Sequence, residues 1–440
     1  MKLIKQDEVL TGGELCLFAL TGILTGLLIT AYKSGLKVLS GLMRQLLTFT
    51  QNNPLYSWLF VLALLLIGLI VYLLTLHDPD SLGSGIPVLY ALIDRKKKNK
   101  WQRTLPLRFI TSLLTVGSGL TLGREGPSVQ MGGLVGQGVR ELYAKEAEPR
   151  YFIGAGAGAA LAVAFNAPLA GICFSLEEMI KRFNKKAVCG SIVTVFFAVI
   201  ASDCLLPNVP LLQAVPKFQL LSLRQYFIVA LIGILAGLSG CLFNVLILNS
   251  NFLYRYLPRQ FVLPFTLIAL LILCDPRLFG VGENMLEYSL KENVGLTTLI
   301  YFYIMKLLLL ALAFGINVPG GTLVPLLVSG ALLGNIYGTL LANLGQIDSS
   351  LIFFFVLLGM CGHFAAIVRT PLTAIILVWE ISGGALAYML CLVLVSLLAY
   401  VTAEFLRVPP FYEYLYDKMV QSLPAKGEAP ASTLKSCFLC

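Results

Sequence analysis

Charged residues are scarce in this chain. They account for 12% of its 440 residues, whereas hydrophobic residues account for 58%, and a typical soluble domain carries about 25% charged residues. The apolar residues form long runs, such as 61–75 and 389–400, and a helix that spans a bilayer needs about 20 mostly apolar residues. The segments of about 10 residues with alternating polarity that mark an outer-membrane barrel are absent. The sequence therefore predicts an all-α polytopic membrane protein.

Histidine is nearly absent, and this excludes several kinds of site. The only two histidines are His77 and His363, which is too few for a His-based metal site or a catalytic triad. The cysteines lie mostly inside apolar runs, where a buried thiol behaves as a small hydrophobe. We therefore expect no metal and no cofactor, and a membrane-embedded enzyme has no nucleophile or metal to work with.

The net charge of +9 is concentrated in short loops beside apolar runs. The two richest loops, 95–103 and 181–186, face the cytoplasm under the positive-inside rule. Membrane orientation alone accounts for the excess charge, and the alternative is that part of it favours anion entry; in either case we expect no nucleic-acid partner. The first apolar stretch has no small-residue cleavage site and is interpreted as a retained span. The expected location is the cell inner (plasma) membrane, with many passes through the bilayer.

The apolar stretches differ in length, and several contain glycine or proline that would break a helix. The stretches lie near residues 14–32, 55–76, 105–121, 152–178, 187–206, 225–249, 261–274, 298–315, 322–345, 351–378 and 384–404.

An internal repeat organises the chain. Gly123–Gly132 and Gly321–Gly330 share the spacing Gly-x3-Pro-x4-Gly at an offset of 198 residues. Pro168–Glu177 and Pro371–Glu380 each place a glutamate nine residues after a proline, at an offset of 203, and a glycine precedes each proline by twelve residues. Duplicated halves with interrupted helices at matching places indicate a transporter whose site lies between the repeats.

The two halves define the predicted domains. The first half-repeat covers residues 1–212 and the second covers 213–420, with a proline-containing linker near 210–222. Residues 421–440 are predicted to be a short disordered tail, too short for a regulatory domain.

Three loops place glycine and proline at presumed helix starts: Gly83–Pro87, Gly123–Pro127 and Pro319–Pro325. Helix N-termini present unpaired N–H groups and the positive end of the helix dipole. Several of them aimed at one point bind an anion without a full positive charge. Ser84 offers a hydroxyl at the first loop, and its other interpretation is a helix N-cap.

Acidic and aromatic residues near these loops have two interpretations each. An intramembrane carboxylate such as Glu125 is a functional candidate, and the alternative is an ion pair with Arg124. Glu177 and Glu178 end an apolar run, where such a pair is commonly a salt-bridged face; a proton-transfer role requires one of them to be buried. Interfacial tyrosines near 412–416 usually anchor a helix at the headgroups.

These motifs together resemble the CLC chloride channel and transporter family. The residues that carry the resemblance are Gly83–Pro87, Gly123–Pro127, Phe165–Gly171 followed by Glu177–Met179, Arg369–Thr373 and Pro410–Tyr412. The resemblance covers about residues 75–418. It implies the CLC-type fold of two inverted helical repeats with many tilted and broken helices, and a homodimer with a separate pathway in each subunit.

The resemblance also implies roles for individual residues. It places the side chains of Ser84, next to Gly85, and Tyr412 on the central anion. The backbone N–H groups around Leu323 and Val324 are its other ligands. It makes Glu125 the gating glutamate, with the N–H groups of Arg124, Glu125 and Gly126 lining an outer anion site. Glu178 matches the internal proton-transfer glutamate of the exchangers.

The expected function is chloride/proton antiport, with small inorganic anions, protons, the lipid bilayer and a second copy of the chain as partners. The alternatives are a fluoride/proton antiporter and a passive, voltage-gated-type chloride channel of the same family. Ser84 favours chloride and Glu178 favours exchange. Leu323 departs from the phenylalanine of the family motif, which puts the affinity of the central site and the coupling between anion and proton in question.

Overall fold

The computed structural model describes residues 10–206, 223–254, 261–282, 284–285, 287, 294–384 and 386–422. Within these ranges the chain is helical and contains no β-strand, only one isolated β-bridge. The predicted all-α class is therefore confirmed. The boundary predicted between the halves near residue 212 and the tail beyond residue 422 lie outside the described residues.

The helices of the first half follow the apolar stretches of the sequence. They are α1 (Gly12–Asn52), α2 (Ser57–His77), α3 (Ile86–Ile93), α4 (Trp101–Gly117), α5 (Glu125–Tyr143), α6 (Pro149–Phe165), α7 (Pro168–Phe174), the π-helical segment η4 (Ser175–Ile180) and α8 (Lys185–Asp203), with short 3-10 turns η2 (Pro54–Tyr56) and η3 (Pro79–Ser81).

The second half repeats this pattern. It contains α9 (Leu223–Leu248), η5 (Ser250–Tyr254), α10 (Val262–Cys274), η6 (Pro276–Leu278), α12 (Leu296–Phe314), α13 (Leu323–Asn343), η7 (Ser349–Leu351), α14 (Ile352–Val368), α15 (Pro371–Ile381), η8 (Leu386–Tyr388), α16 (Met389–Phe405) and α17 (Phe411–Gln421).

Two of the apolar stretches, 152–178 and 351–378, are each broken at the same relative place, as the interrupted repeat predicts. Asn166 and Arg369 end α6 and α14 in the left-handed conformation, with φ of 54° and 70°. Pro168 and Pro371 then start α7 and α15. Proline disfavours helical geometry in the residue before it, and this sets both breaks.

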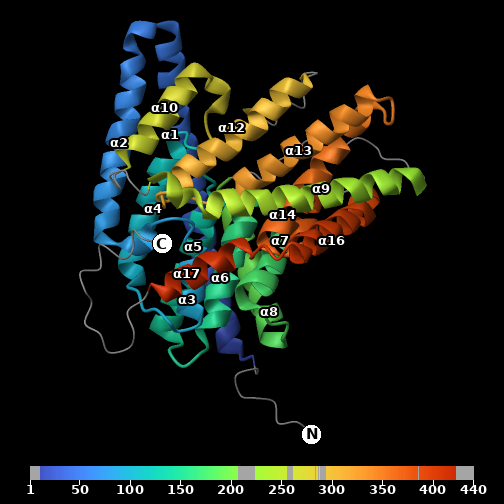
Figure 1. Ribbon diagram of the computed structural model, residues 1–440. Coiled ribbons are helices and arrows are strands. Elements are labelled where there is room, and N and C mark those ends of the chain that lie inside the picture. Colours follow the sequence, from blue (N-terminus) through green and yellow to red (C-terminus); the bar gives the residue numbers. More distant parts are fainter. Residues whose placement is uncertain are drawn as a thin grey trace.

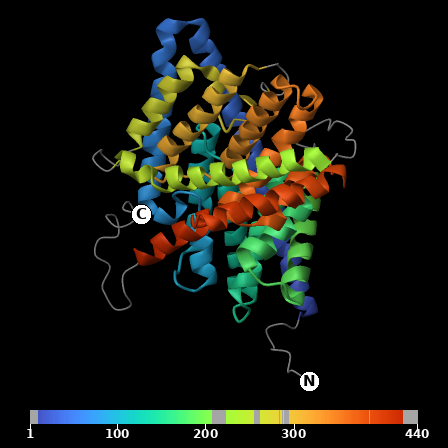
Figure 2. The same ribbon diagram turned by 45° about the vertical axis from the view of Figure 1, so that its right-hand side comes forward.

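Eight helices within the described residues are long and apolar enough to cross a membrane. Figure 1 shows that they are not parallel: α9 and α16 run side by side obliquely across the molecule, and Figure 2 shows the same arrangement from another side. α9 has 26 residues, so it is about 39 Å long. A helix longer than the hydrocarbon core of about 30 Å tilts to fit.

Glycine pairs let helices of each half cross in backbone contact. A Cβ on Gly132 of α5 would lie 2.2 Å from the carbonyl oxygen of Gly156 on α6, and the reverse distance is also 2.2 Å. Gly330 of α13 and Gly359 of α14 oppose one another in the same way, at 2.6 and 2.2 Å. These four glycines are the repeat positions found in the sequence, so the repeat reflects packing that only glycine permits.

A further repeat block was missed in the sequence. Asp78–Gly85 and Asp275–Gly282 both begin Asp-Pro and end Gly-x-Gly, at an offset of 197 residues. Asp78 and Asp275 each accept a backbone hydrogen bond two residues on, with nearly equal φ and ψ (−144°, 99° and −139°, 99°). The identical spacing of aspartate, proline and glycine in the two segments could have revealed this block. The structure shows that both segments form a short 3-10 turn at matching places, η3 and η6.

The repeated glutamates Glu177 and Glu380 join the two halves. Glu177 accepts hydrogen bonds from the backbone N–H groups of Leu372 (3.1 Å) and Thr373 (2.7 Å) at the start of α15. Glu380 accepts from Leu169 (2.9 Å) and Ala170 (2.7 Å) at the start of α7. Each carboxylate therefore satisfies the free N–H groups of a helix in the other half. The interpretation of Glu177 as part of a salt-bridged face was wrong.

Candidate functional site

Three helix starts meet near the centre of the molecule, as the sequence predicts. Gly123 and Gly321, which are equivalent in the repeat, form a β-bridge with two N–H···O bonds of 2.7 Å. Gly83 donates to Asn317 O (2.9 Å) and accepts from Gly320 N (3.1 Å). The loops before α3, α5 and α13 are therefore connected directly, and their helices begin at Ile86, Glu125 and Leu323.

Close approach of these loops requires glycine. A Cβ on Gly321 would lie 2.6 Å from the backbone nitrogen of Gly126. Gly85, with φ of 81°, would place a Cβ 2.0 Å from the side chain of Gln130. Backbone N–H groups can thus be gathered around a small volume that side chains would otherwise fill.

A buried arginine fixes the first loop. Arg108 of α4 has no solvent exposure and donates to the carbonyl oxygens of Ser81 (2.6 Å), Gly83 (2.9 Å) and Ser84 (2.8 Å). Its counterpart at an offset of 198 is the equally buried Lys306 of α12, which donates to Gly280 O at 2.9 Å. Both were missed, although a cation inside an apolar stretch is a recognisable signal.

Three hydroxyl groups gather beside the helix starts. Ser84, Thr322 and Tyr412 are 3%, 0% and 0% exposed, and Tyr412 lies close enough to interact with the other two. None of the three hydroxyls makes a hydrogen bond of ordinary geometry within the described part of the chain. Buried polar groups normally have partners, so this arrangement leaves donors for a ligand.

The structure brings Ser84 and Tyr412 together as predicted, and adds Thr322, which was missed. Ser84 is not the N-cap of α3, because Gly85 takes that position. Tyr412 is fully buried, so it is not an interfacial anchor. Leu323 and Val324 begin α13 immediately after Thr322 and are buried at 0% and 6% exposure.

Glu125 is the first residue of α5 and is completely buried. Its Oε1 lies 3.4 Å from Nε of Arg124, so the ion pair considered from the sequence is present. Its other oxygen lies close to Gly123, at 2.6 Å from the position that a Cβ on this glycine would take. The carboxylate therefore lies beside the loop that forms the bridge to Gly321.

Glu178 is also buried, with 4% exposure, and it lies on η4. The hydroxyl of Tyr90 on α3 donates to its Oε1. The ammonium group of Lys181 lies 5.1 Å from the centre of the Tyr90 ring and pairs with Glu413 of α17. Tyr90 was missed, because nothing in the sequence places α3 beside η4.

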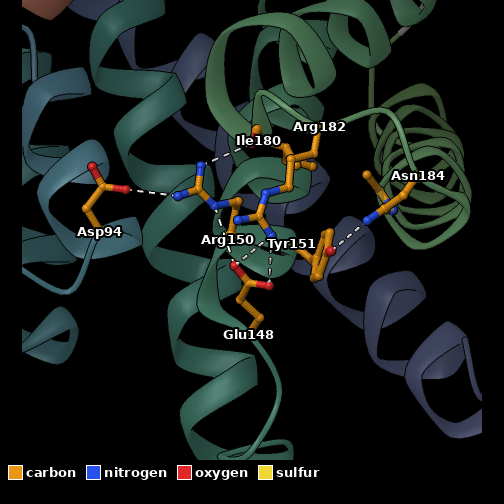
Figure 3. Close-up of polar contacts among 8 residues, drawn as sticks. Asp94, Glu148, Arg150, Tyr151, Ile180, Arg182 and Asn184 are labelled. Carbon is orange, nitrogen blue, oxygen red and sulfur yellow. Dashed lines mark hydrogen bonds and ion pairs between the residues drawn. The ribbon is translucent and has the colours of Figure 1, made fainter. Parts of the chain in front are cut away.

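Arg150 at the start of α6 holds these elements together (Figure 3). It donates to Ile180 O at the end of η4 (3.1 Å) and to Asp94 after α3 (2.9 Å). Glu148 lies 3.5 Å from both Arg150 and Arg182. The segments that carry Glu178 and Tyr90 are therefore tied to the same guanidinium.

Two cavities reach the site from opposite sides. The basic loops are expected to face the cytoplasm, so the cavity on the other side is called the outer cavity. It has a volume of about 690 Å³, and Arg124 and Glu125 line it. The inner cavity has a volume of about 110 Å³ and its lining includes Ser84 and Gly85. Asp80 and Lys97 form an ion pair there. Burial raises the pKa of Asp80 above its ordinary value, and Lys97 opposes that effect.

The family model described as voltage gated chloride channel matches residues 63–404. The chain belongs to this family. The match includes the helix starts, Glu125, Glu178 and both buried cations, and it confirms the resemblance predicted from the motifs.

Family members with similar sequences include two named H(+)/Cl(-) exchange transporter ClcA. The protein of Vibrio campbellii is 32% identical over 92% of this chain and 89% of its own length. That of Citrobacter koseri is 30% identical over 93% and 89%.

Solved family structures have the same fold. A slow cyanobacterial Cl-/H+ antiporter superposes with a TM-score of 0.87 at 28% identity, over 94% of this chain and 99% of that chain. A CLC-type fluoride/proton antiporter superposes with a TM-score of 0.76 at 22% identity, over 89% and 96%, which is a likeness of fold alone.

Proposed function

We propose that this protein exchanges chloride for protons across the inner membrane. The observation that carries the proposal is the placement of two buried carboxylates, Glu125 and Glu178, around a buried cluster of hydroxyls that make no hydrogen bond of ordinary geometry within the described residues. The similar proteins named H(+)/Cl(-) exchange transporter support the same activity. They are transporters, which agrees with the expectation that the chain is not an enzyme.

The anion is bound by dipoles and hydroxyls. The hydroxyls of Ser84 and Tyr412 and the backbone N–H groups at Leu323 and Val324 are its proposed ligands, and Thr322 adds a third hydroxyl. Helix N-termini supply partial positive charge. Binding of this kind is favourable without being so strong that the anion cannot leave. Arg108 orients the Ser84 loop through its hydrogen bonds to the carbonyl groups of that loop.

Glu125 couples the anion to the proton. When ionised, the carboxylate competes with chloride for the N–H groups of Arg124 to Gly126. When protonated, it no longer attracts those donors and the outer anion site opens to the cavity that it lines. Glu178 exchanges protons with the cytoplasmic side. Its exposure is only 4%, and the hydrogen bond from Tyr90 orients its carboxylate.

The sequence at Leu323 shapes the coupling. A leucine side chain at the start of α13 is smaller than the phenylalanine of the family motif, so we propose weaker central-site affinity and looser coupling. The fluoride/proton antiporter remains the alternative within the family, and the buried hydroxyl of Ser84 favours chloride. A passive channel has no use for a second buried glutamate. The subunit works as a homodimer in this proposal.

The test uses liposomes that contain the purified protein, with chloride release and external pH followed together. We expect a chloride gradient to drive protons uphill. Glu125→Gln should abolish proton movement and keep chloride flux, and Glu178→Ala should do the same. Uphill proton movement in either variant would contradict the assigned role, and chloride flux without protons in the unmodified protein would make it a channel. Preferential release of fluoride would favour the fluoride/proton alternative.

A further inference from the structure

The outer cavity is much larger than its proposed cargo requires. Its volume is about 690 Å³, whereas one water molecule needs only about 10–15 Å³ on this measure. The inner cavity has about 110 Å³. The outer side can therefore admit solutes far larger than chloride.

The described residues that line the outer cavity include four cations and one acid. The cations are Lys33, Lys37, Arg44 and Arg124, and the acid is Glu125. The described lining of the inner cavity has fewer cations, which are Lys97, paired with Asp80, and Lys418. The described residues that line the outer cavity thus carry a net positive charge of about three even when Glu125 is ionised.

Within the described part of the chain, the contacts of Lys33, Lys37 and Arg44 leave much of their charge uncompensated. Lys33 donates to Val163 O (2.9 Å) and to the amide oxygen of Asn166 (3.0 Å), which are neutral groups. Arg44 lies 5.6 Å from the centre of the Phe279 ring, and Lys37 is exposed. Asp203 attracts Lys33 from a longer distance.

Three of the cations form a row on one helix. Lys33, Lys37 and Arg44 are spaced by four and seven residues on α1, a spacing that places them on one helical face. The row is about 16 Å long. A single chloride ion can neutralise only one point of such a row, whereas a linear anion with several charges can contact the row and Arg124 together.

We propose that the outer cavity binds linear multivalent oxyanions of the condensed-phosphate class from the outer side, and that a bound polyanion blocks the route to Glu125. The block rests on the proposed anion transport, whereas binding does not. The site is separate from the central anion site, since none of Lys33, Lys37 and Arg44 belongs to the central cluster. Attraction between exposed charges is screened by salt, so binding weakens as ionic strength rises.

The binding test is calorimetric titration of the purified protein with phosphate, pyrophosphate and tripolyphosphate in magnesium-free buffer. We expect affinity to rise with the number of charges. Lys37→Gln combined with Arg44→Gln should lower tripolyphosphate affinity by about tenfold. The matched control is Lys98→Gln combined with Lys100→Gln, which removes two exposed cations from the loop before α4 and should leave affinity unchanged.

The transport test adds tripolyphosphate to one side of the liposome membrane at a time. We expect chloride flux to fall only with the polyanion on the outer side, and the α1 double variant to carry chloride while resisting the block. Equal affinity in the α1 variant and the unmodified protein, or equal block from both sides, would overturn the proposal. Polyanion binding in a protein without chloride flux would refute the transport function and leave the site standing. Normal chloride/proton exchange without polyanion binding would refute the site alone.

Discussion

Removing the Tyr90 hydroxyl should change the pH dependence of proton transport. In Tyr90→Phe the ring remains between Lys181 and Tyr416, to which it presents its face and edge, and only the hydrogen bond to Glu178 is lost. That bond is donated to a carboxylate, so it is strongest when Glu178 is ionised. Without it, the protonated form of Glu178 is favoured.

The magnitude follows from the type of bond. A hydrogen bond to a charged group contributes about 1.5–3 kcal/mol, and one pH unit corresponds to about 1.4 kcal/mol. The pH of half-maximal proton uptake should therefore rise by about 1–2 units. The other groups that act on Glu178, which are Lys181, Glu413 and Glu177, are retained in the variant.

The assay is chloride-driven proton uptake into liposomes over a range of internal pH, together with calorimetric chloride binding. We expect the profile to move to higher pH with unchanged chloride affinity. Tyr416→Phe is the control, because it removes a tyrosine hydroxyl that bonds to Asp94 and not to Glu178. An unmoved profile, a shift to lower pH, or an equal shift in the control would refute the role of Tyr90.

Three further predictions concern packing and the anion site. Gly132→Ala should lower the free energy of unfolding by about 1–3 kcal/mol, because its Cβ would meet Gly156 O at 2.2 Å. Gly41→Ala is the control and should leave stability unchanged, since a Cβ there has nothing within 4 Å. Thermal denaturation in detergent compares the two variants. Thr322→Val should weaken chloride binding several-fold in calorimetry, since one neutral hydrogen bond contributes about 1 kcal/mol; unchanged affinity would exclude Thr322 from the site. Arg108→Met leaves three buried carbonyls without their donor and should unfold the Ser84 loop, so both thermal stability and chloride affinity fall; a stable variant with normal affinity would contradict this.

The sequence by itself determined the fold class, the family and the positions of the helix starts. Apolar runs, glycines and prolines are local signals, and the motifs at Gly83–Pro87, Gly123–Pro127 and Pro319–Pro325 lie within single short segments. The predicted starts of α3, α5 and α13 are where the structure has them. The repeat offsets also came from the sequence, because duplicated halves keep the spacing of residues that packing requires.

Only the tertiary structure decided which residues act together. Tyr90 meets Glu178 across 88 residues, and Glu177 caps α15 across 195, contacts that no spacing rule encodes. The helix breaks at Asn166 and Arg369 depend on the left-handed backbone conformation of these two residues, which the sequence of the apolar runs does not reveal. Burial decided the roles of individual polar residues, since the same residue types at the surface would form hydrogen bonds with water. Tyr412 became a ligand candidate and Arg108 a loop anchor because both side chains are fully buried and buried polar groups need partners.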